Sequence, residues 1–191
     1  MSSAFRKIFW GFLFVLIEIN LEFIDILPDP IGYILIFTGI SYLANRFPAG
    51  NKAKAWAFAL IFLSIPDVFI SNMEINTLHR FSGWSIYQTA LGVLRLILIF
   101  YLFHLMLAIS EKSTNQELYN WTKKFSKIYI TIMLLSYLFT PIGINLNEEL
   151  LLGLIGITTL VGIVIEIMFL VLIHRYKKLG GIYVRPRDNT I

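Results

Sequence analysis

Three acidic residues near the start of the chain have the spacing of one helical face. Glu18, Glu22 and Asp25 are four and three residues apart, so a helix would place their carboxylates on one side. Carboxylate oxygens bind hard cations such as Mg²⁺, and carboxylates inside membranes relay protons. We therefore predict a cation or proton site with Glu18 and Glu22 as central ligands. Asp25 and Asp29 would lie at its outer entrance.

Three further ionisable residues, Arg95, His104 and Glu166, fall inside long apolar segments. Such groups cost ~2.5–3.5 kcal/mol each on membrane-insertion scales, so they normally face partners or water. As a gate or counter-charge, Arg95 can neutralise one or two of Glu18, Glu22 and Glu166. His104 and Glu166 have similar predicted depths, which indicates a hydrogen-bonded pair or, alternatively, a proton relay. A structural polar cluster that sets helix register is the alternative to a functional site.

The segments that hold these residues are apolar enough to require lipid around them. Of the 191 residues, 57% are hydrophobic and 15% are charged, and the mean hydropathy is +0.73. A spanning helix needs ~20 mostly apolar residues. We therefore predict an all-α fold, a polytopic membrane helix bundle that forms one transmembrane domain over residues 1–191. Its six helices are predicted at about 8–27, 31–47, 55–70, 85–109, 125–144 and 150–174, followed by a basic cytoplasmic tail at 175–191.

Two prolines, Pro28 and Pro30, break the connection between the first two predicted helices. Proline has no backbone donor, and Pro30 disfavours helical geometry at Asp29. The apolar part of the second segment, residues 31–44, would cover only ~21 Å as a helix. Either the break dips into the outer leaflet or the first two segments form a re-entrant hairpin. Close packing between helices is predicted at four glycines: Gly32, Gly39, Gly153 and Gly156.

The positions of the basic residues predict the orientation. Of the 16 Lys and Arg residues, all except Arg80 and Arg95 fall where six crossings would place them on one side. Cytoplasmic loops retain such residues, so both termini are predicted to be cytoplasmic. These short basic clusters beside apolar segments do not resemble a nucleic-acid surface. The predicted partners are the lipid bilayer and either further copies of the chain or a larger membrane complex.

Residues 25–36 read Asp-Ile-Leu-Pro-Asp-Pro-Ile-Gly-Tyr-Ile-Leu-Ile. This segment resembles the DILPDxIGYILI motif of small polytopic membrane proteins of Firmicutes-type bacteria, a family of unassigned function. Pro30 occupies the variable position. The resemblance implies a bacterial plasma membrane and supplies no catalytic role. It singles out five motif positions: Asp25, Pro28, Asp29, Gly32 and Tyr33.

Recognised enzyme motifs are absent from the sequence, which has no H-E-x-x-H, no G-x-S-x-G and no P-loop. This favours a protein that is not an enzyme, and no cofactor is predicted beyond a cation at Glu18, Glu22 and Asp25. The leading hypothesis is a plasma-membrane protein that binds or passes a small cation or proton through its polar interior. The alternative is a non-catalytic subunit of a larger transporter, envelope or sensor complex. A second alternative is a metal-dependent enzyme that modifies membrane lipids.

Overall fold

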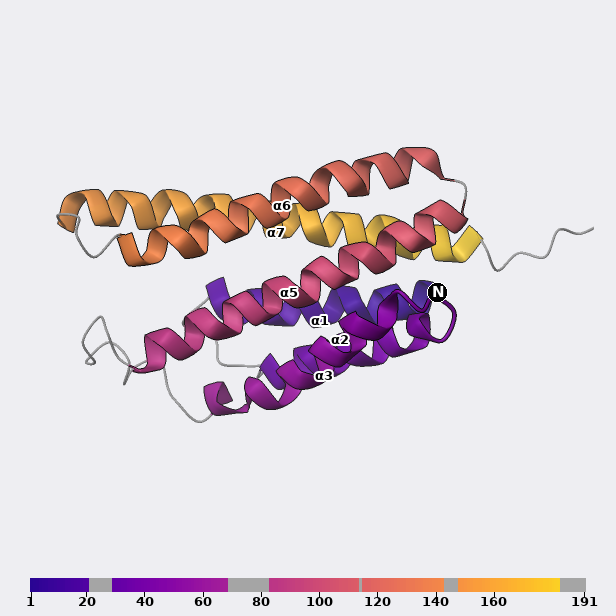
Figure 1. The fold of residues 1–191 in the computed structure, drawn as a ribbon, viewed down its shortest axis with the longest axis horizontal. Coiled ribbons are helices and arrows are strands. Elements are labelled where there is room, and N and C mark those ends of the chain that lie inside the picture. Colours follow the sequence, from indigo (N-terminus) through magenta and orange to yellow (C-terminus); the bar gives the residue numbers. More distant parts are fainter. Residues whose placement is uncertain (21–28, 69–82, 114, 143–147, 183–191) are drawn as a thin grey trace, which may run out of the picture.

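The computed structural model describes residues 1–20, 29–68, 83–113, 115–142 and 148–182. Over these ranges the chain forms α-helices and one short 3-10 helix, with no strand, so the predicted all-α class is confirmed (Figure 1). The elements are α1 (Ser2–Asn20), α2 (Asp29–Ala44), α3 (Gly50–Leu63), η1 (Ile65–Val68), α5 (Gly83–Lys112), α6 (Gln116–Ile142) and α7 (Glu148–Ile182). Two of the described helices, α5 and α7, are long and apolar enough to cross a membrane.

The helix ends differ from the predicted boundaries for local chemical reasons. Helix α2 begins at Asp29, with Pro30 in the first turn, where a missing N–H costs nothing. Helix α6 begins at Gln116, well before residue 125, because the Asn115 Oδ1 accepts the Leu118 N–H at 2.9 Å and caps it. Helix α7 continues to Ile182, so part of the predicted basic tail is helical.

The helices run lengthwise beside one another and form a closed ring. Each helix packs against the next one in the sequence, and α7 packs back against α1. The contact between α6 and α7 is the smallest in the ring. The start of α1 and the C-terminal ends of α2, α5 and α7 lie at the same end of the bundle, on the right in Figure 1. Because the basic residues of the described helices, apart from Arg95, gather toward this end, we call it the basic end.

Glycines let α1 and α2 approach each other closely. A Cβ added at Gly11 would lie 2.6 Å from the Gly32 carbonyl oxygen, and one at Gly32 would lie 2.9 Å from that of Gly11. A Cβ at Gly39 would lie 2.7 Å from the Ala4 carbonyl oxygen. Side chains other than hydrogen therefore do not fit at these crossings. The predicted close packing at Gly32 and Gly39 is confirmed.

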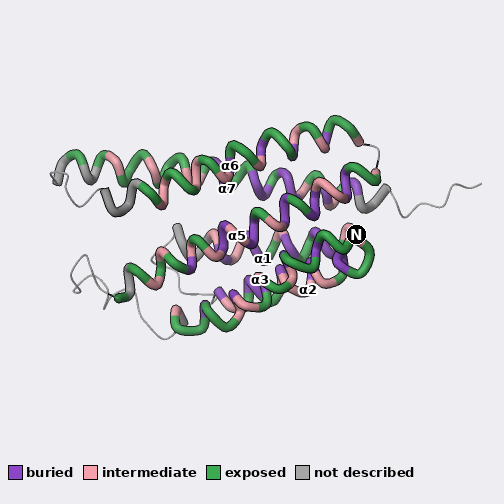
Figure 2. Tube along the Cα trace, viewed as in Figure 1, coloured by how far each residue is buried: buried purple, intermediate pink, exposed green. Residues whose placement is uncertain are grey.

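Burial is uneven along the bundle and strongest toward the middle and the basic end (Figure 2). There Tyr176 of α7 is fully buried, with its ring centroid 5.4 Å from that of Phe5 and its hydroxyl 2.9 Å from Thr122 Oγ1. The first half of α7 is mostly exposed. A Cβ at Gly153 or Gly156 would meet no described atom within 4 Å, so the predicted packing at these two glycines does not occur within the described chain.

We expect Gly39→Ala to lower the free energy of unfolding by about 1–3 kcal/mol, because its methyl group would overlap the backbone of α1. Thermal unfolding of the detergent-solubilised protein measures this. The matched control is Gly156→Ala, which adds the same methyl group in open space. Since alanine favours a helix by ~0.5–1 kcal/mol over glycine, the control should be neutral or more stable. Equal destabilisation by both substitutions would contradict the close packing.

Candidate functional site

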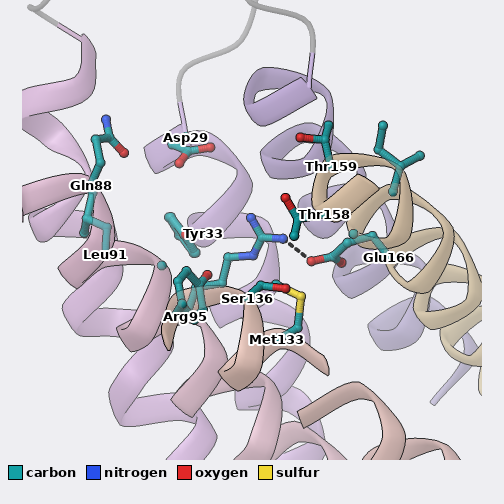
Figure 3. Close-up of a pocket in the computed structure, with 14 residues that line it drawn as sticks. Asp29, Tyr33, Gln88, Leu91, Arg95, Met133, Ser136, Thr158, Thr159 and Glu166 are labelled. Atoms are coloured by element: carbon teal, nitrogen blue, oxygen red, sulfur yellow. Dashed lines mark hydrogen bonds and ion pairs between the residues drawn. The ribbon is translucent and has the colours of Figure 1, made fainter. Parts of the chain in front are cut away.

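Arg95 lies in the interior of the bundle and is paired with Glu166. Its Nη2 on α5 donates to Glu166 Oε1 on α7 (Figure 3), and the exposed fractions of the two side chains are only 8% and 6%. Tyr129 of α6 donates its hydroxyl hydrogen to the same carboxylate oxygen at 2.8 Å. The pair therefore joins three helices. Glu166, one of the three carboxylates predicted to neutralise Arg95, is therefore its partner within the described part of the chain.

Four aromatic side chains, Phe12, Phe103, Tyr129 and Phe169, form a layer that we call the aromatic floor. Ring centroids lie 5.1 Å apart for Phe12 and Phe169, 5.6 Å for Phe103 and Tyr129, and 5.4 Å for Phe103 and Phe169. All four residues are at most 2% exposed. Their edge-to-face geometry is the favourable one for aromatic rings. Because Phe103 and Phe169 follow Arg95 and Glu166 along α5 and α7, the floor lies between the ion pair and the basic end.

A cavity of about 400 Å³ lies on the other side of the ion pair, between α2, α5, α6 and α7. In Figure 3 the Arg95 guanidinium extends across it toward Glu166, with Thr158 beside the pair and Asp29 near the start of α2. Gln88 and Thr159 are exposed at its rim, so the cavity is open to the surroundings. Its polar lining comprises Asp29, Tyr33, Gln88, Arg95, Ser136, Tyr137, Thr158, Thr159 and Glu166.

The wall of this cavity depends on a glycine in α5. A Cβ at Gly92 would lie 2.5 Å from the hydroxyl oxygen of Tyr137 and 2.8–2.9 Å from atoms of its ring. Because Gly92 has no side chain, the ring of Tyr137 can lie against the backbone of α5. Tyr33 of α2 is also buried in the wall, at a motif position. Two tyrosines from different helices thus flank the ion pair.

Asp67 adds a second carboxylate beside the cavity rim. It belongs to η1, beyond the end of α3, and its Oδ1 accepts a hydrogen bond from Gln88 Nε2 at 2.7 Å.

The remaining predicted ligands are only partly covered by the structure. Asp29 is buried at the cavity wall. Glu18 belongs to α1, but its side chain lies outside what the structure describes, and Glu22, Asp25 and Pro28 lie outside the described residues. Within the described part of the chain, no three His, Asp or Glu residues are close enough to hold a metal ion. The predicted acidic row therefore stays a prediction.

The predicted pair of His104 and Glu166 does not form. Glu166 is buried and bonded to Arg95 and Tyr129, whereas His104 is exposed and its ring centroid lies 4.8 Å from that of Phe100. The reason is helical geometry: Arg95 and His104 are nine residues, or about two and a half turns, apart, which puts them on opposite faces of α5. The similar predicted depth of His104 and Glu166 in the membrane is therefore not enough to bring them into contact.

Sequence reasoning missed the hydroxyl groups that surround the ion pair. On α7, Thr158, Thr159, Gly162 and Glu166 all line the cavity, and their spacing of three, four, seven and eight residues is that of one helical face. This small and polar stripe was a usable signal in an otherwise apolar segment. Tyr129 gave no such signal, since tyrosine is common in apolar helices.

Comparison of the chain with protein-family models, curated proteins and solved structures gives no match. The described site is a polar cavity with a paired guanidinium at its base, hydroxyl groups on its walls and two carboxylates near its mouth. Such a site can bind a small polar solute.

We expect Glu166→Gln to lower the free energy of unfolding by about 3–5 kcal/mol, because it leaves the guanidinium of Arg95 buried without a counter-charge. Chemical or thermal unfolding in detergent measures the loss. Tyr129→Phe removes one hydrogen bond to a charged group and should cost less, about 1.5–3 kcal/mol. The double variant Arg95→Met with Glu166→Gln should recover much of the stability. Wild-type stability in Glu166→Gln would contradict a structural role for the pair.

Proposed function

We propose that the protein is an integral plasma-membrane protein with six spans and both termini in the cytoplasm. The two long apolar helices α5 and α7 and the antiparallel neighbours packed around them support this topology. The gathering of the basic residues at one end also supports it, because cytoplasmic ends retain Lys and Arg. Several of these cations lie over aromatic rings, as Arg46 does over Tyr42 and Arg175 over Trp121, and such rings favour the membrane interface.

This topology can be tested with single cysteines, because the chain has none of its own. Gln88→Cys places a thiol at the cavity rim and Lys124→Cys places one on the exposed surface of α6 near the basic end. In intact cells, a membrane-impermeant maleimide should label Gln88→Cys and leave Lys124→Cys unlabelled. Both variants should be labelled after permeabilisation. Labelling of both, or of Lys124→Cys alone, in intact cells would rule out the proposed orientation.

Within this topology the cavity faces the outside and is closed toward the cytoplasm by the aromatic floor. The ionisable residues of its lining are two carboxylates, Asp29 and Glu166, and one guanidinium, Arg95. Glu166 is paired with Arg95, and Asp29 and the nearby Asp67 add two further carboxylates at the mouth of the cavity. This acidic character of the described lining is the observation that carries the proposed function: the cavity binds a small cation.

The size and walls of the cavity limit what this cation can be. A volume of about 400 Å³ lies within the ~300–1,000 Å³ of small-molecule pockets, so the cavity can hold a hydrated ion or a small protonated amine. Hydroxyl oxygens from Ser136, Thr158 and Thr159 can replace water around either one. The bound cation would neutralise part of the negative charge near Asp29. This electrostatic attraction offsets the free energy that the cation loses when it gives up water molecules.

We expect the purified protein in liposomes to carry protons, K⁺ or methylammonium, and Asp29→Asn to reduce that flux about tenfold, which corresponds to ~1.4 kcal/mol of lost attraction. Asparagine also caps helices well, so α2 should be retained. The matched control is Glu111→Gln, which neutralises an exposed carboxylate near the basic end of α5. Equal flux in wild type and Asp29→Asn would contradict the site.

A second candidate function, a subunit of a larger membrane complex, is favoured by one observation. The first half of α7 exposes large apolar side chains, among them Ile157 at 67% and Leu160 at 65%, and Gly153, Gly156 and Gly162 of this helix have open space beside them. Another helix could pack there. Absence of flux from the purified chain, with flux restored by a co-purifying membrane protein, would favour this function over the first.

A further inference from the structure

A second cavity lies on the outside of the bundle, in the groove between α5 and α6. It has a volume of about 370 Å³. Phe100, Leu107 and Ile130 supply its apolar lining, and His104 and Lys127 are its two basic residues. The buried ring of Phe103 separates it from the centre of the bundle. None of the described carboxylates lines this groove, whereas the ammonium of Lys127 does, so the groove is positively charged, in contrast to the cavity between α2, α5, α6 and α7.

The two basic residues of the groove have no role in the site described above. His104 is exposed, and its predicted partner Glu166 is bonded elsewhere. Lys127 is exposed and has no carboxylate within ion-pair distance among the described residues. An exposed imidazole and ammonium beside apolar side chains need an anionic or polar partner from outside the chain.

The groove lies where the polar and apolar parts of the bundle meet. Lys127 is the last charged residue of α6 before the apolar run of residues 128–142. His104 lies about 12 Å from the C-terminal end of α5, and Lys127 lies about 16 Å from the start of α6, so the two antiparallel helices bring them to similar depth. In the proposed topology this depth is the boundary between headgroups and acyl chains of the cytoplasmic leaflet.

We propose that the groove between α5 and α6 binds an anionic phospholipid of the cytoplasmic leaflet. Lys127 and His104 hold the phosphate, and one acyl chain lies along Phe100, Leu107 and Ile130. A groove that faces the bilayer is filled by lipid or by another helix, and two basic side chains with no carboxylate beside them favour the phosphate. Basic pockets between helices on the cytoplasmic side are typical sites of this kind. The inference depends on the proposed topology but not on cation binding.

Native mass spectrometry of protein extracted from bilayers of phosphatidylglycerol and phosphatidylcholine tests this site. We expect wild type to retain phosphatidylglycerol, and Lys127→Gln to lower its affinity about fivefold, the equivalent of ~1 kcal/mol for one charge near the surface. His104→Gln combined with Lys127→Gln should abolish retention. Lys127→Arg keeps the charge and should keep the lipid. The matched control is Lys124→Gln, which removes an exposed lysine of α6 that does not line the groove.

Three results would overturn the proposal. Equal retention in wild type and the double variant would place the lipid elsewhere, and an equal loss in Lys124→Gln would reduce the effect to general attraction of basic residues. Displacement of the lipid by millimolar inorganic phosphate would assign the groove to a soluble anion. A lipid-free dimer that dissociates in the double variant would assign it to a second copy of the chain. Cysteine labelling tests the topology separately, so its failure is distinguishable from failure of the lipid site.

Discussion

The buried ion pair between Arg95 and Glu166 is the constraint on which the arrangement of the bundle depends. A guanidinium in an apolar interior is tolerated only beside a counter-charge, so α5 and α7 must meet at this depth. The hydroxyl of Tyr129 brings α6 to the same point. Below the pair, aromatic rings fill the interior, and above it the helices leave a cavity. One polar contact therefore marks the change from a packed half to an open half.

The packed half and the open half are built from different side chains. At the crossing of α1 and α2, hydrogen side chains at Gly11, Gly32 and Gly39 let two backbones touch, which leaves little freedom of movement. The first half of α7 and the last turns of α6 have exposed large side chains and a small mutual contact. Any movement that alters access to the cavity is therefore easier for α6 and α7 than for α1 and α2.

The sequence predicted features that a local pattern of residues indicates. It did not predict contacts that depend on which faces of two helices pack together. Arg95 was conspicuous because a basic residue is costly inside an apolar segment, and Gly32 and Gly39 because glycines in apolar helices allow close packing. The partner of Arg95 was narrowed to three carboxylates but not chosen, since depth alone does not give rotation about a helix axis. The same ambiguity produced the wrong pair of His104 with Glu166. The aromatic floor combines four helices that are distant in sequence, so no local pattern indicates it.

Because Glu166 is paired with Arg95, other carboxylates of the cavity must attract the cation. A carboxylate that accepts hydrogen bonds from a guanidinium and a phenol has little negative potential left for a ligand, so the deepest acid of the cavity serves as an anchor. The attraction then comes from Asp29 and Asp67 near the mouth of the cavity, where Gln88 is exposed at the rim. A cation drawn in by the outer acids would meet the guanidinium of Arg95 at the base of the cavity. Passage beyond that point requires Arg95 and Glu166 to separate. If they stay paired, the cation stops above them.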